Sequence, residues 1–100
     1  YGSDYIKEHK VALVAGGGNN LEGIEEIIEL GINTYVTGIT AHNEFSKDVH
    51  EFEEKHKINL IGGTHYSTEK FACIKMCKYF EHFSLNCQFL EDIPVLEDLE

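Results

Sequence analysis

The sequence predicts an α/β protein in which about four strands form a mostly parallel or mixed sheet covered by helices. Short runs of β-branched and apolar residues alternate along the chain with longer segments whose apolar residues recur at helical spacing. Each of the first three runs ends in a turn that contains glycine. Connections of this kind are right-handed, and they place neighbouring strands parallel to one another.

The first strand is predicted within 11–18, where the run VALVA leads into three glycines. A helix is predicted over 19–31, because Asn19 can act as its N-cap, Glu22 follows three residues later and Gly31 is a natural stop. The apolar face of this helix is formed by Leu21, Ile24, Ile27, Ile28 and Leu30.

The rest of the chain repeats this alternation. Strands are predicted at 33–38 and 58–63, and helices at 41–57 and 67–83. A fourth strand is predicted at 86–93, where Pro94 ends it, and an antiparallel position at the sheet edge would suit it. The apolar faces of the two helices are formed by Phe45, Val49 and Phe52, and by Phe71, Ile74, Cys77 and Phe80.

Length and charge restrict the classes of protein to consider. The 100 residues suffice for one domain with one core. Residues 1–10 are interpreted as a linker or the remnant of a cut in a longer chain, and residues 11–100 as the domain.

The formal charge of −10, with eight lysines and no arginine, disfavours binding to nucleic-acid phosphates. No stretch approaches the roughly 18 apolar residues of a membrane span, so we expect a cytoplasmic protein with no membrane contact.

The three cysteines are Cys73, Cys77 and Cys87, and no CxxC spacing occurs. We interpret them as reduced core residues of an intracellular protein. Cys73 and Cys77 lie four residues apart on a predicted helix, a spacing that permits a bridge without requiring one.

The turns after the first three strands contain the candidate pocket residues. Because the carboxyl ends of parallel strands share one edge, we expect these turns to line one crevice. A phosphate loop is the alternative for the triple glycine, but Leu21 occupies the third glycine position of the dinucleotide fingerprint, which favours a tight turn without a ligand. The candidate pocket residues are Gly16, Gly17, Gly18, Thr37, Gly38 and His42.

His65 and Glu69 are the candidate metal ligands. Their spacing at a helix start places both side chains on one face. An imidazole and a carboxylate together suit divalent Zn, Fe, Mn or Ni. The alternative is an ordinary helix start, where the helix dipole favours an acidic residue such as Glu69. The other histidines are interpreted as solvated, and these are His9, His50, His56 and His82.

Three segments carry a resemblance to a known family. VALVAGGG, TYVTGITAH and INLIGGTHYSTEK resemble, in order and spacing, the C-terminal half of the NGG-interacting-factor-three-like family, whose members are also called GTP cyclohydrolase I type 2 homologs. The resemblance covers about residues 11–95, and its most specific part is GTHYSTEK, which is similar to the G-H-Y-x-T-E signature of the family. The closing FLEDIP resembles the tail of archaeal members.

The resemblance implies a two-lobed α/β protein with a dinuclear metal centre between the lobes, assembled into homo-hexamers. It makes His65 and Glu69 the ligands from this half, while a histidine pair and an aspartate would come from the N-terminal half. Thr37, Gly38 and His42 match the family segment T-G-[D/E]-x-x-H, which lines the same cleft. Two positions depart from the family pattern, with Ile39 in place of the acidic residue and Asn43 in place of a second histidine.

Three functional interpretations follow from the resemblance. The first is half of a metal-dependent hydrolase for a small nucleotide-like substrate, completed by a missing N-terminal half or by oligomerisation. The second is a non-catalytic metal-binding or regulatory assembly module, and the third is a folded half without independent activity. We expect the half to be inactive alone, because a catalytic metal takes about three protein ligands.

Overall fold

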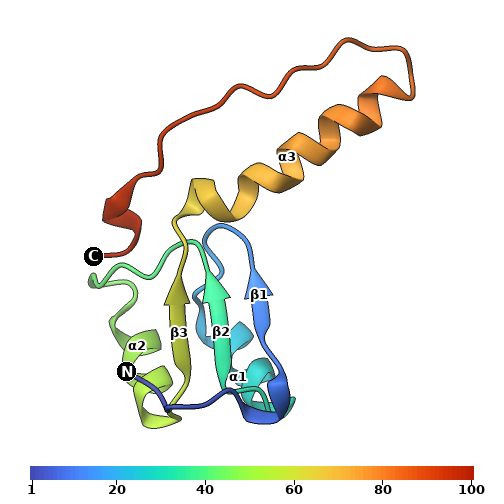
Figure 1. Cartoon of the computed structure of the whole chain (residues 1–100). Coiled ribbons are helices and arrows are strands. Elements are labelled where there is room, and N and C mark those ends of the chain that lie inside the picture. The colour runs from blue at the N-terminus through green and yellow to red at the C-terminus, as the bar shows by residue number, and fades with distance from the viewer.

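The computed structural model describes residues 1–100 and has an α/β fold with a three-stranded parallel sheet (Figure 1). The predicted fold class and the parallel pairing are confirmed. The strands are adjacent in chain order, and their bounds are β1 (Ala12–Val14), β2 (Thr34–Thr37) and β3 (Asn59–Gly62).

Three α-helices accompany the sheet, and two short 3-10 helices lie at Lys7–His9 and Leu96–Asp98. None of the helices combines the length and the apolar character that a membrane crossing requires. The α-helices are α1 (Leu21–Glu29), α2 (Lys47–Lys55) and α3 (His65–Glu81).

One face of the sheet packs against α1 and α2. Tyr35 in β2 is 1% exposed and lies in a core with Ile24 and Ile27 of α1, Val49 of α2 and Ile58. Side chains alternate along a strand, so Ala12 and Leu60, the register neighbours of Tyr35, pack against the same core. Burying a side chain of this size contributes about 1.5–3 kcal/mol, which makes this layer the main source of stability.

Helix α1 is shorter than the predicted 19–31, and its N-cap lies one residue after the predicted Asn19. Asn20, not Asn19, is the N-cap, and its side-chain oxygen accepts a hydrogen bond from the Gly23 amide at 3.0 Å. Gly31 follows the helix with a φ of +72°, the left-handed conformation that ends many helices. Of the predicted apolar face, Ile24 and Ile27 are buried, Ile28 is half-buried, and Leu21 and Leu30 are exposed.

Helix α2 is shorter than the predicted 41–57. The Asn43 side chain accepts hydrogen bonds from the Phe45 and Ser46 amides at 2.9 and 3.1 Å, and this local turn competes with a helical start. His42 therefore lies in a loop and not at a helix start, and Phe45 is 95% exposed instead of facing the core.

The predicted fourth strand at 86–93 is not formed. Helix α3 projects from the sheet, and the chain returns beside it as an irregular segment (Figure 1). The Asp92 amide of this segment donates to the Tyr66 hydroxyl at 3.0 Å, so its contacts are to α3 and not to a strand ladder. The cysteines were wrongly expected in the core, because Cys73 is exposed and Cys77 and Cys87 are half-buried.

The second face of the sheet carries no helix. Leu13 and Ile61, which flank Val36 in one register row, are 69% and 48% exposed. The prediction of covering helices is therefore correct for one face only. Residues 1–10 run along the amino-terminal ends of the strands. There the side-chain Nδ2 atoms of Asn33 and Asn59 each donate a hydrogen bond to the Tyr5 carbonyl at 3.0 Å. The proposed domain boundary at residue 10 stays a prediction.

Candidate metal centre

Hydrogen bonds join the turns that follow the three strands into one continuous edge. The Gly38 amide donates to the Gly16 carbonyl at 2.8 Å, and the Gly63 amide donates to the Thr37 carbonyl at 2.9 Å. The Thr37 hydroxyl accepts from the Gly18 amide and donates to the Gly16 carbonyl, both at 3.1 Å. These bonds hold turns that are about 20 residues apart in the chain in fixed relative positions.

Helix α3 is attached to the same edge through its first turn. The Thr68 hydroxyl accepts a hydrogen bond from the Gly16 amide at 2.9 Å. A Cβ atom on Gly38 would lie only 2.5 Å from the Thr68 Oγ1 atom, so a glycine at 38 is what allows α3 to approach the turn after β2.

His65 and Glu69 lie one turn apart on α3, and their side chains converge. The His65 Nε2 and Glu69 Oε2 atoms are 3.0 Å apart, and the two side chains are 47% and 48% exposed. Gly16, with a φ of +68°, lies directly against the pair, because a Cβ at this position would clash with the Glu69 carboxylate and come within 3.0 Å of His65 Nε2. A glycine at position 16 is therefore what allows the His65 and Glu69 side chains to lie against the β1 turn.

Thr64 carries backbone strain immediately before this pair. Its φ of +51° is rare for a β-branched residue and costs on the order of 1–3 kcal/mol. Its side chain is the N-cap of α3, and its Oγ1 atom accepts from the Ser67 amide at 3.2 Å. A positive φ is the conformation that glycine, but not threonine, adopts without strain.

Asp98 in the C-terminal 3-10 helix also reaches this edge, although no sequence motif indicated it. Its Oδ2 atom accepts a hydrogen bond from the His65 amide at 2.8 Å, which places a carboxylate at the N-terminus of α3. Its carbonyl accepts from the Thr40 and Ala41 amides at 2.7 and 2.9 Å. Only the fold brings the tail to this position, and the acidic run at the end of the chain gave no specific signal for it.

Gly17 and Gly18 have different surroundings. Gly18 is buried, its carbonyl accepts from the Tyr35 hydroxyl at 2.6 Å, and a Cβ there would overlap Val14. Gly17 is exposed, with Ile39 as the nearest side chain to a Cβ built on it, at 3.4 Å. Gly18 is thus required by packing, which agrees with the tight-turn interpretation of this glycine run.

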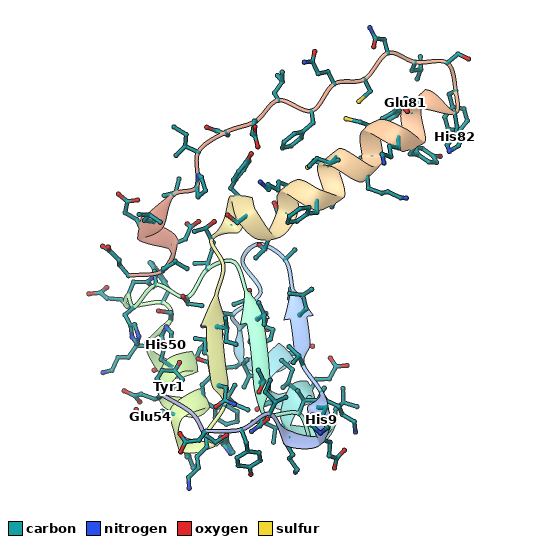
Figure 2. All side chains as sticks on the ribbon, viewed as in Figure 1. Tyr1, His9, His50, Glu54, Glu81 and His82 are labelled. Carbon is teal, nitrogen blue, oxygen red and sulfur yellow. The ribbon has the colours of Figure 1, made fainter.

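The structure groups His42 with a second polar cluster and not with the His65/Glu69 pair. The His42 ring stacks on His50 at a centroid distance of 3.8 Å. His50 is 5% exposed, so its assignment to solvated surface was wrong. Its Nδ1 atom lies 2.6 Å from the Tyr1 hydroxyl, which also donates to Glu53 at 2.5 Å (Figure 2 shows Tyr1 and His50 together beside α2).

Glu53 is the fully buried member of this second cluster. Burial raises the pKa of its carboxyl group, and hydrogen bonding from Tyr1 together with the nearby His50 opposes the shift. Burial, together with the neighbouring Glu53, raises the pKa of the Tyr1 hydroxyl. The position of Glu53, four residues after Val49, was the available signal, because it places Glu53 on the buried face of α2.

The His65/Glu69 pair offers nitrogen and oxygen donors of the types that bind divalent transition metals. The convergence of the two side chains and their half-exposure fit a bound ion at this edge. No group of three or more His, Cys, Asp or Glu side chains in the chain could hold a metal ion. The chain by itself therefore presents two ligands of an open site.

The chain is thus an α/β protein that carries a histidine and a glutamate beside the carboxyl ends of its parallel strands. The chain belongs to the Duf34/NIF3 (NGG1p interacting factor 3) family, whose sequence profile matches residues 2–94. It is 33% identical over 92 residues to a protein of Borreliella burgdorferi described as a GTP cyclohydrolase 1 type 2 homolog. The family predicted from the motifs is confirmed.

The aligned region covers 92% of this chain but 29% of the Borreliella burgdorferi protein. The chain therefore spans less than a third of that relative. No solved structure matches the chain.

Proposed function

We propose that this chain supplies His65 and Glu69 to a divalent-metal site, and that the complete protein is a metal-dependent hydrolase for a small nucleotide-like substrate. The observation that carries the proposal is the 3.0 Å approach of His65 Nε2 to Glu69 Oε2 at an exposed sheet edge. The description of the relative as a GTP cyclohydrolase homolog supports the substrate class.

Each residue at the edge has a defined part in this proposal. His65 and Glu69 would hold the ion, and Gly16 has no side chain that would displace the Glu69 carboxylate. Thr68 fixes the Gly16 backbone by accepting its amide hydrogen bond. A divalent ion held there would polarise a substrate oxygen and lower the pKa of bound water, which is the usual contribution of a metal to hydrolysis.

Two ligands leave the site short of the about three that proteins supply to a catalytic metal. We infer that the further ligands come from the rest of a longer chain or from another copy in a homo-oligomer. The exposed apolar residues of α3, with Phe71 at 67% exposure and Met76 at 55%, support association with such a partner. The same residues favour a second candidate function, a metal-binding assembly module without catalysis.

Metal titration by calorimetry tests the site. Zn²⁺ and Mn²⁺ should bind at least about tenfold more weakly to His65→Ala and Glu69→Ala than to the wild type, a difference of ~1.4 kcal/mol. His82→Ala is the matched control, because His82 lies at the opposite end of α3 (Figure 2) and should leave the affinity unchanged. Equal affinity in the wild type and both pair variants would reject the site.

An activity assay then separates the two candidate functions. The full assembled protein should hydrolyse GTP or a related nucleotide, lose turnover with a chelator and regain it when the metal is restored. Metal binding without turnover would leave the assembly module as the function. Turnover that ignores the chelator would exclude the metal mechanism.

A further inference from the structure

Cys77 and Cys87 bring two thiols together from separate parts of the chain. Cys77 lies on α3, Cys87 lies on the irregular segment that returns beside it, and their Sγ atoms are 3.1 Å apart. Both side chains are half-buried, whereas Cys73, one helical turn before Cys77, is exposed. A disulfide bond length of about 2.05 Å requires the sulfurs to move closer by only about 1 Å.

Few other contacts hold the returning segment to α3. One is the hydrogen bond between Tyr66 and the Asp92 amide, and another is a 3.9 Å ion pair between Lys70 and Glu91. The Glu91 side chain is 76% exposed, so solvent screens this pair. A segment with so few buried contacts opens easily, and a covalent link here would change its behaviour more than it would in a packed core.

We propose that Cys77 and Cys87 form a reversible intramolecular disulfide that fastens the returning segment to α3, and that Cys73 takes no part in it. The oxidant is a low-molecular-weight disulfide such as glutathione disulfide. The inference does not rest on the proposed metal site, because neither cysteine belongs to it.

The chemistry is a two-step thiol–disulfide exchange. One thiol loses its proton and attacks a sulfur of glutathione disulfide, which forms a mixed disulfide and releases one glutathione thiolate. The second thiolate attacks the protein sulfur of that mixed disulfide and releases the second glutathione. The two cysteines lose two electrons and two protons in total, and two glutathione thiols carry them away.

The position of the thiols favours the second step over accumulation of the mixed disulfide. The partner thiol is held at an effective concentration of about millimolar or higher by the short chain between positions 77 and 87. The hydrogen bond with Cys87, followed by burial, raises the pKa of the Cys77 thiol. Exchange should therefore accelerate as the pH rises, because the thiolate is the attacking species.

Mass spectrometry in glutathione buffers tests the pairing. In a Cys73→Ser background, oxidised protein should lose the mass of two hydrogen atoms and carry no glutathione. The matched variants that add Cys77→Ser or Cys87→Ser should each keep one glutathione adduct, because no second thiol is available to displace it. In the wild type, peptide mapping should recover a linked Cys77–Cys87 peptide.

Two results would overturn the proposal. One is a Cys73→Ser protein that accumulates two glutathione adducts, and the other is a wild-type link between Cys73 and Cys77. Limited proteolysis gives a second measurement, in which oxidation should slow cleavage within 84–95 several-fold in the wild type and in Cys73→Ser, but not in the variants that also lack Cys77 or Cys87. Equal slowing in the variants that lack Cys77 or Cys87 would also contradict the proposed disulfide.

Discussion

The sheet with α1 and α2 and the arm formed by α3 and the returning chain differ in one physical respect, which is burial. The five buried apolar residues that form the core all belong to the first region. No residue from His65 onward is buried, although this part contains many large apolar side chains. The molecule is accordingly elongated, with extents of 50 × 30 × 23 Å, and the arm accounts for its upper part in Figure 1.

The difference shows that apolar composition alone does not make a core. Phe71 and Ile74 have the spacing of a buried helical face, yet they are 67% and 37% exposed because no layer lies against them. The core stabilises the first region, whereas the arm leaves large apolar side chains exposed. The candidate metal pair lies where the two regions meet, attached to the sheet turns through Gly16 and Thr68.

The largest expected effect comes from a pair of matched isoleucine truncations, one in the core and one on the arm. Ile24→Ala should lower the free energy of unfolding by about 2–5 kcal/mol, because the Ile24 side chain is 0% exposed and its removal leaves a cavity in the core. Ile74→Ala on the arm should cost much less, because that side chain already contacts solvent. Urea denaturation measures both variants. Equal losses would mean that the arm packs as firmly as the sheet region.

A smaller effect should appear at the junction between the two regions. Gly16→Ala and Gly31→Ala both force alanine into a positive φ, at a cost of about 1–2 kcal/mol each. Only the alanine at position 16 would also clash with Glu69, since nothing lies within 4 Å of a Cβ at Gly31. Gly16→Ala should therefore be the less stable variant and should also weaken Zn²⁺ binding. Calorimetric affinities that match in the two variants would show that Gly16 does not border the site.

The smallest effect concerns the buried carboxyl of the first region and depends on pH. Glu53 has a folded-state pKa above its ordinary value of 4.5. Its contribution to stability is therefore complete below the unfolded pKa and is lost as the pH rises through the folded pKa. Glu53→Gln removes this dependence, so the stability of the variant relative to the wild type should increase with pH across this window.

Thermal unfolding measured at several pH values tests the prediction. Glu81→Gln on the exposed end of the arm is the matched control, and its stability difference from the wild type should stay flat. A flat difference for Glu53→Gln as well would mean that the carboxyl is not desolvated in the folded protein.

Local features were predicted best from the sequence. The alternation of strands and helices, the stop at Gly31 and the placement of His65 and Glu69 on one helical face all depend on neighbouring residues in the chain. Errors arose where two local arrangements compete or where distant segments decide the outcome. The Asn20 cap on Gly23 and the Asn43 turn before α2 are local contacts that compete with the predicted ones, whereas the burial of His50 depends on Tyr1, 49 residues away in the chain.

The candidate site divides in the same way. The spacing of His65 and Glu69 placed them on one face, but the contact with Gly16 arises only because the parallel sheet aligns turns from separate strands. His42 shared the expected edge in the sequence analysis, and it joined His50 because the Asn43 turn keeps residues 41–46 out of the helix. Asp98 was missed because the contact with His65 spans 33 residues.

The sequence by itself determined the α/β class, the family and the pair of converging metal-type donors, because hydrophobic periodicity, turn residues and helical spacing act over a few positions. The tertiary structure alone decided which apolar faces are buried, which histidine is shielded from water and which two cysteines meet. Those outcomes depend on which surfaces come into contact, and burial is a property of the contact between segments and not of either segment alone.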